Sequence, residues 1–142
     1  NFRFKNARII VRPEEMDFAR KEAEGGQNIY FRFEDLDHPD IHYVYLERGG
    51  QDFRLLDGID ILYTPGHTAG TQSVLVDTAQ GRVLIAGDSI YIRKDNFEEG
   101  IMPGICYSEE DQRNTIKKLK GLGDIILLPG HDPFLKLEKA YG

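Results

Sequence analysis

Residues 64–88 read TPGHTAGTQSVLVDTAQGRVLIAGD, and this stretch decides the fold. Two apolar segments within it, Gln72 to Asp77 and Val83 to Gly87, are predicted to be strands. The loop Thr78-Ala79-Gln80-Gly81 that joins them contains the glycine that a short antiparallel loop favours. In such a hairpin the start of the first strand and the end of the second lie at the same end. His67 and Asp88 are therefore expected to lie close together.

A third loop of the same kind follows a strand predicted over Ile125 to Leu128. That run is continuously apolar, as expected for a strand buried on both faces, and it leads into Pro129-Gly130-His131-Asp132. All three loops share one design, in which an apolar strand is followed by a glycine and then by His or Asp. Glycine permits the sharp turns that loops need when they converge on one ion. Imidazole and carboxylate groups suit zinc, iron or manganese.

Each of these residues has a simpler interpretation when it is considered alone. A His after Pro-Gly is most often a turn residue, and an Asp after a strand usually caps a turn or a helix. Asp132 is expected either to orient His131 or to cap the turn. The convergence of three such loops at strand ends nevertheless favours a metal site formed by His67, Asp88 and His131.

The rest of the chain predicts further helices and strands. A helix is expected from Pro13 to about Glu24, because proline occupies its first turn and acidic residues lie near its positive end. A polar connection is expected from Asp35 to Asp40. A second helix should begin after its cap Ser108 and end at Gly123, with a buried apolar stripe. That stripe comprises Ile116, Leu119 and Leu122. Short strands are expected at Ala7 to Val11, Ile29 to Phe33, Tyr43 to Glu47, Asp52 to Leu56 and Ile59 to Tyr63.

Composition limits the class of protein. The chain has 142 residues, of which 40% are hydrophobic, and this suits one compact domain. Its net charge of −6 disfavours nucleic acid as a partner, because such binding depends on attraction to phosphate. No segment approaches the length of a membrane span. The single cysteine, Cys106, is expected to be a buried structural thiol and fits a reducing compartment, so a soluble cytoplasmic protein is predicted.

In their order along the chain, the three loops resemble motifs of a known family. TPGHTAGTQSVLV at 64–76, LIAGD at 84–88 and LLPGH at 127–131 look like the third, fourth and fifth motifs of the metallo-β-lactamase superfamily. DSIY at 88–91, followed by KDNFE at 94–98, further resembles the N-acyl homoserine lactonase branch. The resemblance covers essentially the whole chain. It implies an α+β fold, namely the C-terminal portion of the metallo-β-lactamase αββα sandwich.

The resemblance also implies roles for individual residues. His67 would complete the ligands of one divalent metal ion, Asp88 would bridge two ions at the catalytic centre, and His131 would bind the second ion. Zinc is the first expectation for both ions, with iron, manganese or cobalt as alternatives. Tyr91 matches a lactonase tyrosine that contacts the substrate carbonyl or the leaving oxygen. An aromatic side chain packed at the base of a loop is the alternative for Tyr91.

The chain departs from the family pattern in several places. The family's His-x-His-x-Asp-His motif appears nowhere in it, so residues 1–142 are expected to be a single metallo-β-lactamase-like domain truncated at its N-terminal side. Thr71 stands where many members carry a second His that is not a metal ligand. The two other histidines, His38 and His42, are expected to be solvated loop residues.

These features predict a metal-dependent hydrolase that opens a lactone or related small-molecule ester, with a hydroxide activated by metal ions as the nucleophile in the intact parent protein. Two other kinds of enzyme stay open, a thioesterase like glyoxalase II and a phosphodiesterase. A third alternative is that this chain alone is inactive because its metal site is incomplete. The oligomeric state also stays open, a homodimer included.

Overall fold

The structure is a computed structural model that describes residues 4, 6–26 and 32–133. The chain divides into two compact units, Asn1–Gly50 and Gln51–Gly142. The α+β fold class predicted from the sequence is confirmed by the mixture of helices and strands in both units. Within the described residues, no helix is long and apolar enough to cross a membrane.

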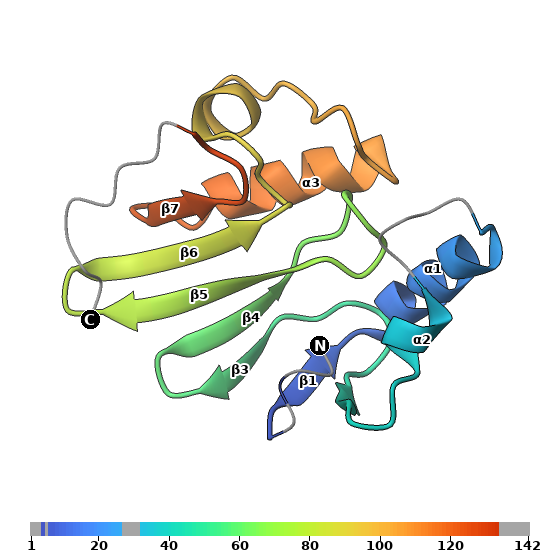
Figure 1. Cartoon of the computed structure of the whole chain (residues 1–142). Helices are drawn as coiled ribbons and strands as arrows, with labels where there is room; N and C mark the ends of the chain where they lie inside the picture. Colours follow the sequence, from blue (N-terminus) through green and yellow to red (C-terminus); the bar gives the residue numbers. More distant parts are fainter. Residues whose placement is uncertain (1–3, 5, 27–31, 134–142) are drawn as a thin grey trace. The chain divides into compact units, whose positions relative to one another are not determined.

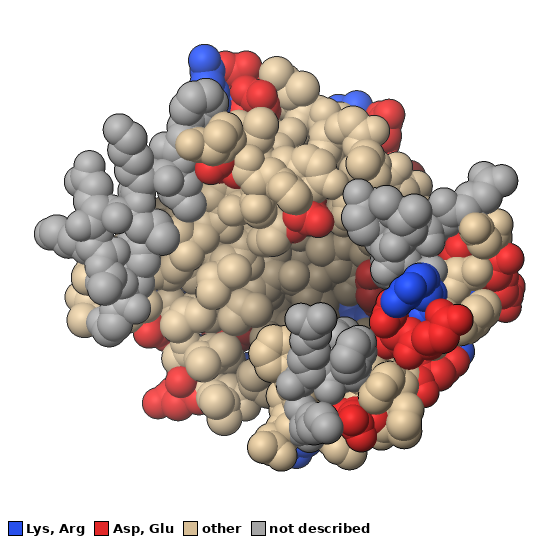
Figure 2. Space-filling model, in the orientation of Figure 1, with Lys and Arg blue, Asp and Glu red and all other residues tan. Residues whose placement is uncertain are grey.

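The first unit contains a short parallel strand pair connected through helices. Its elements are β1 (Arg8–Val11), α1 (Pro13–Glu24), α2 (Phe33–Leu36) and β2 (His42–Tyr45), and β1 pairs with β2 in parallel. A parallel pair requires a crossover connection, which the helices provide. Acidic side chains gather over these helices on the face shown in Figure 2.

Two predictions for the first unit need correction. Phe33 begins helix α2 rather than ending a strand, and the rest of the strand predicted from Ile29 lies largely outside the described residues. The polar connection predicted from Asp35 to Asp40 includes the end of the same helix. A helix of four residues is too short to give a periodic pattern, so propensity alone could not identify it.

The second unit is built on a five-stranded sheet in the order β3-β4-β5-β6-β7 (Figure 1). Neighbouring strands from β3 to β6 are antiparallel, whereas β7 runs parallel to β6. Between β6 and β7 the chain forms a π-helical turn, η1 (Arg93–Glu98), and helix α3 (Glu109–Lys120). The strands are β3 (Phe53–Leu56), β4 (Ile59–Tyr63), β5 (Gln72–Thr78), β6 (Gly81–Gly87) and β7 (Ile126–Pro129).

Helix α3 packs against one face of this sheet and completes its core. Alternate residues of the strands point toward the helix, as the two-residue period of a strand requires. The buried cluster comprises Leu62, Leu75, Leu84, Ala86, Ile90, Ile116, Leu119 and Leu127. The opposite face is also apolar, because paired residues form a continuous row across all five strands. That row comprises Phe53, Ile61, Val74, Ile85 and Leu128.

Most boundaries in the second unit follow the sequence prediction. As expected, Ser108 caps α3, since its Oγ accepts a hydrogen bond of 3.2 Å from the Asp111 amide. The structure differs from the prediction in three respects. The helix ends at Lys120 rather than at Gly123, and Gly123 instead adopts a φ of 79° in the turn before β7. Strand β7 is buried fully only at Leu127, so the expectation of two buried faces is wrong. The π-helical turn was not predicted.

Candidate metal centre

The three sequence-predicted ligand loops meet at one edge of the five-stranded sheet. Strands β4 and β6 are each antiparallel to β5 and therefore run in the same direction, and β7 is parallel to β6. The C-terminal ends of these three strands consequently lie at one edge. His67 follows β4, Asp88 follows β6 and His131 follows β7.

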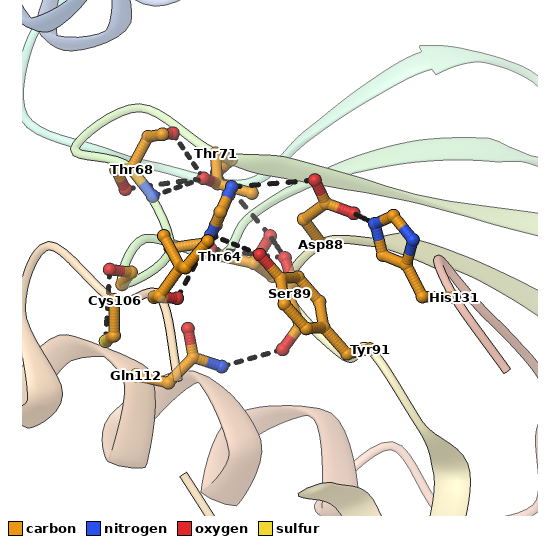
Figure 3. Close-up of polar contacts among 12 residues, drawn as sticks. Thr64, Thr68, Thr71, Asp88, Ser89, Tyr91, Cys106, Gln112 and His131 are labelled. Carbon is orange, nitrogen blue, oxygen red and sulfur yellow. Dashed lines mark hydrogen bonds and ion pairs between the residues drawn. The ribbon is translucent and has the colours of Figure 1, made fainter. Parts of the chain in front are cut away.

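The carboxylate of Asp88 lies between the two imidazole rings. Its Oδ1 is 3.0 Å from Nε2 of His131, and its Oδ2 is 3.5 Å from Nε2 of His67. Figure 3 shows His131 pointing at this carboxylate. His67 is mostly buried, whereas the side chains of Asp88 and His131 are 40% and 61% exposed. The group is therefore anchored on one side and open to solvent on the other.

This donor set fits divalent metal ions. Two imidazole nitrogens and a carboxylate are ligands that zinc and its neighbours accept, and the carboxylate presents a different oxygen to each ring. In the part of the chain that the structure describes, no three His, Cys, Asp or Glu residues form a group that could hold one ion by themselves. A shared carboxylate with one histidine on each side is thus what the described residues offer. The assignment of these residues as metal ligands stays a prediction.

Hydrogen bonds orient the ring of His67. Its Nδ1 lies 3.3 Å from the carbonyl oxygen of Ile105 and 3.0 Å from the hydroxyl of Tyr91. An Nδ1–H that donates to the Ile105 carbonyl leaves Nε2 unprotonated on the side of Asp88. Such a bond to the outer nitrogen is the usual way in which proteins fix a metal-binding histidine.

Tyr91 packs between the two histidines. Its ring makes edge contacts with His67 and His131, with centroid distances of 5.4 Å and 4.9 Å. Tyr91 is half-buried, and Figure 3 shows it beside Asp88 and His131. The structure therefore brings Tyr91 to the predicted site, with its hydroxyl on His67 and its ring packed at the base of the loops.

Close backbone contact fixes the loop that carries His131. The amides of Gly130 and His131 donate to the carbonyls of Ile90 and Tyr91 at 2.9 Å and 3.0 Å. A Cβ atom at Gly130 would lie 2.7 Å from Oδ1 of Asp88, so only glycine fits beside this carboxylate.

Beneath the site lies a triangle of buried hydroxyl groups that the sequence analysis missed. Thr64, Ser73 and Ser89 are all fully buried, and their Oγ atoms are 2.8 to 3.2 Å apart. These residues join the end of β4, the start of β5 and the end of β6. The sequence did contain a signal for this buried cluster. Ser73 is a polar residue on the same strand face as the core residue Leu75, where an apolar residue is expected.

Thr71 closes the loop between β4 and β5. Its Oγ1 accepts a hydrogen bond of 3.0 Å from the Thr68 amide, and its carbonyl accepts one of 3.0 Å from the Thr64 amide. Thr71 therefore supports the loop that presents His67.

The remaining residues singled out in the sequence lie away from the carboxylate or have structural partners. Asp132 accepts a hydrogen bond of 3.1 Å from the Arg93 amide and so caps the start of η1.

Cys106 is half-buried, and its thiol donates a hydrogen bond to the carbonyl of Gly66. Burial raises the pKa of the Cys106 thiol, which disfavours the reactive thiolate. His38 and His42 belong to the first unit, where His42 is exposed on β2 rather than in a loop.

Comparison with known proteins identifies the family. The chain belongs to the metallo-β-lactamase superfamily, whose domain model matches residues 3–131. The N-acyl homoserine lactonase of Bacillus thuringiensis is 32% identical over 136 residues, which cover 93% of this chain and 50% of that protein. The lactonase AttM of Agrobacterium fabrum is 31% identical over 140 residues, covering 92% and 52%. The chain thus spans about half the length of the curated relatives it matches.

Solved structures agree with this assignment. An N-acyl homoserine lactone hydrolase with N-hexanoyl-L-homoserine bound at its catalytic metal centre has a TM-score of 0.76 and 29% identity, covering 97% of this chain and 54% of that one. The dizinc quorum-quenching lactonase AidC shares the fold at a TM-score of 0.64 and 18% identity, covering 95% and 53%. The superfamily predicted from the sequence is therefore confirmed, and so is the similarity to N-acyl homoserine lactonases.

Proposed function

We propose that His67, Asp88 and His131 contribute metal ligands to a dinuclear lactonase whose remaining ligands come from outside this chain. The observation that carries the proposal is the Asp88 carboxylate, which turns one oxygen toward each of two imidazole Nε2 atoms. A carboxylate placed in this way can be shared by two ions. The metal we propose is zinc, since imidazole and carboxylate ligands suit it.

The residues of this chain have distinct tasks in the proposed reaction. Divalent metals, when bound, would polarise the substrate carbonyl and make hydroxide available near neutral pH. Asp88 holds the site together from the end of β6, and the bond from Nδ1 to Ile105 keeps the ring of His67 in place. The hydroxyl of Tyr91 lies at the same centre and can donate a hydrogen bond to an oxygen that gains charge as the ester bond breaks.

Lactones and related esters are favoured over thioesters and phosphodiesters as substrates. The lactonase relatives and the position of Tyr91 support the ester classes. The net charge of −6 works against an anionic phosphodiester, because the field of the protein would repel it.

The test compares turnover of an N-acyl homoserine lactone, an acyl thioester and a phosphodiester by an enzyme in which this chain is joined to the missing ligand motif. We expect the highest kcat/KM with the lactone. A thioester or phosphodiester that reacts faster would move the function to another branch of the superfamily. No turnover of any of the three by a metal-loaded enzyme would favour an inactive protein.

In that enzyme, Tyr91→Phe is expected to lower kcat by roughly tenfold to a few hundredfold, as loss of one oxyanion-type donor does. Metal content should stay unchanged, because Nδ1 of His67 keeps its bond to the Ile105 carbonyl and the phenylalanine ring keeps the edge contacts with both histidines. Steady-state kinetics with lactones, together with elemental analysis, measures both quantities.

The matched control is Tyr63→Phe, which also loses a phenol hydrogen bond, the one of 2.9 Å to the Ala69 carbonyl. This variant should lose about 1 kcal/mol of stability while kcat stays close to the parent value. Equal kinetics for Tyr91→Phe and the parent would leave Tyr91 with a packing role alone.

A further inference from the structure

Helix α3 contacts both of the loops that carry His67 and Asp88. The side chain of Gln112 is completely buried, and its Nε2 donates a hydrogen bond of 2.7 Å to the carbonyl of Ser89, the residue after Asp88 (Figure 3). On its other side, Gln112 lies directly against Gly66, the residue before His67. A Cβ atom at Gly66 would be only 2.5 Å from Cα and from Oε1 of Gln112.

Further contacts tie the same helix to the His67 loop. The carbonyl of Gly66 accepts hydrogen bonds from the amides of Tyr107 and Ser108 at 2.8 Å and 3.1 Å, just before the helix begins. One turn after Gln112, the hydroxyl of Thr115 donates a bond of 2.7 Å to the carbonyl of Pro65. The His67 loop is therefore fixed to α3 at two consecutive residues, 65 and 66. Gln112 links that assembly to the Asp88 loop.

Apolar packing alone does not explain the amide of Gln112. Its Oε1 is buried and has no hydrogen-bond partner among the described residues, which is unfavourable compared with an apolar side chain of the same size. Gln112 also lies on the buried face of α3, one turn before the core residue Ile116. A methionine would fill this space without an unpaired acceptor. What the amide adds is the donor to Ser89.

We propose that Gln112 is a positioning residue that sets the distance between His67 and Asp88 and thereby the affinity of their metal site. The inference rests on the proposed function, which makes these two residues ligands. Metal ligands must be held within a few tenths of an ångström. Loss of an outer hydrogen bond that supports a ligand typically costs 10- to 100-fold in metal affinity. Gln112 acts through the backbone at residues 66 and 89 rather than by touching the metal.

The test uses the 142-residue chain and the near-isosteric variant Gln112→Met, which removes the donor to Ser89. We expect its Zn²⁺ affinity, measured by competition with a chromophoric chelator, to fall by roughly 10- to 100-fold. In the metal-free chain, the amide chemical shifts of His67, Asp88 and Ser89 should change as well. That second measurement requires no metal and no activity.

The matched control is Asn96→Leu. Asn96 is also buried, and the hydrogen bonds of its amide join Ile92 to Ile101 around η1 rather than residues 66 and 89. The Asn96→Leu variant should lower the free energy of unfolding in urea as much as Gln112→Met does. It should leave the Zn²⁺ affinity and the amide chemical shifts of His67 and Asp88 unchanged. Gln112→Asn keeps an amide that is one methylene too short to reach Ser89, and it replaces the methionine variant if that variant does not fold.

The outcomes separate this inference from the proposed function. If the unsubstituted chain binds no Zn²⁺, the ligand assignment fails, and the metal-free shifts still decide whether Gln112 positions the loops. If Gln112→Met leaves the shifts at His67 and Asp88 unaltered, or if Asn96→Leu changes them equally, Gln112 has no positioning role. Unchanged Zn²⁺ affinity with altered shifts also overturns the proposal.

Discussion

Gly66→Ala is expected to lower the free energy of unfolding by about 2–6 kcal/mol, which combines backbone strain with overpacking. Gly66 has a φ of 138°, a conformation that residues with a side chain rarely adopt. The added methyl group would also lie 2.5 Å from Cα and 2.7 Å from Cβ of Gln112. Those atoms belong to the backbone and first carbon of a packed helix, so they cannot move aside as the end of a flexible side chain could.

Gly104→Ala is the matched control for this substitution. Gly104 lies in the loop before α3, and an added Cβ there would meet no heavy atom within 4 Å. The free energy of unfolding of the Gly104→Ala variant should stay within about 0.5 kcal/mol of that of the parent chain. Urea unfolding of the two variants gives the comparison. A Gly66→Ala chain as stable as Gly104→Ala would mean that α3 does not press on the His67 loop.

Elements governed by local sequence could be predicted with little error. The hairpin of β5 and β6 turns between Thr78 and Gly81 as its short glycine-containing loop indicated. The cap at Ser108 and both ends of α1 also follow from residues within one turn of each boundary. The hairpin further explains why the sequence alone is enough to place His67 and Asp88 together.

Features that depend on contacts between distant segments could not be predicted in the same way. The π-helical turn η1 depends on Asp132, which caps it from 39 residues further along the chain. Gln112 reaches Ser89 across a separation of 23 residues. A polar residue on the apolar stripe of α3 was a usable signal for Gln112. Its partner was not evident, because no local pattern specifies which loop a buried amide faces.

Asp88→Asn is expected to remove the binding of both divalent metal ions from this chain, whereas His67→Ala and His131→Ala should each weaken mainly one. The reason is the geometry of the carboxylate, which has Oδ1 near His131 and Oδ2 near His67. An asparagine has no negative charge and keeps only one oxygen acceptor. At most one ion would then keep an oxygen ligand beside its imidazole, and that oxygen would carry no negative charge.

The ligand count sets the affinity expected for the unsubstituted chain. It offers each ion one histidine and a shared aspartate, whereas a catalytic zinc normally takes three protein ligands. Binding should therefore be weak, and most metal should be lost on dialysis. Titration followed by elemental analysis measures the stoichiometry of the parent and of the three variants.

The neighbouring carboxylate provides the control for Asp88→Asn. Asp132→Asn also removes one negative charge, but asparagine keeps the oxygen that accepts the hydrogen bond from the Arg93 amide. Its metal affinity should stay close to that of the parent chain, because the cap of η1 is preserved. Equal losses in the two variants would reduce the role of Asp88 to general charge attraction.

Two ions that stay tightly bound after dialysis would contradict the ligand count, since two protein ligands per ion cannot hold zinc in that way. A second chain that donates histidines would then have to complete the site.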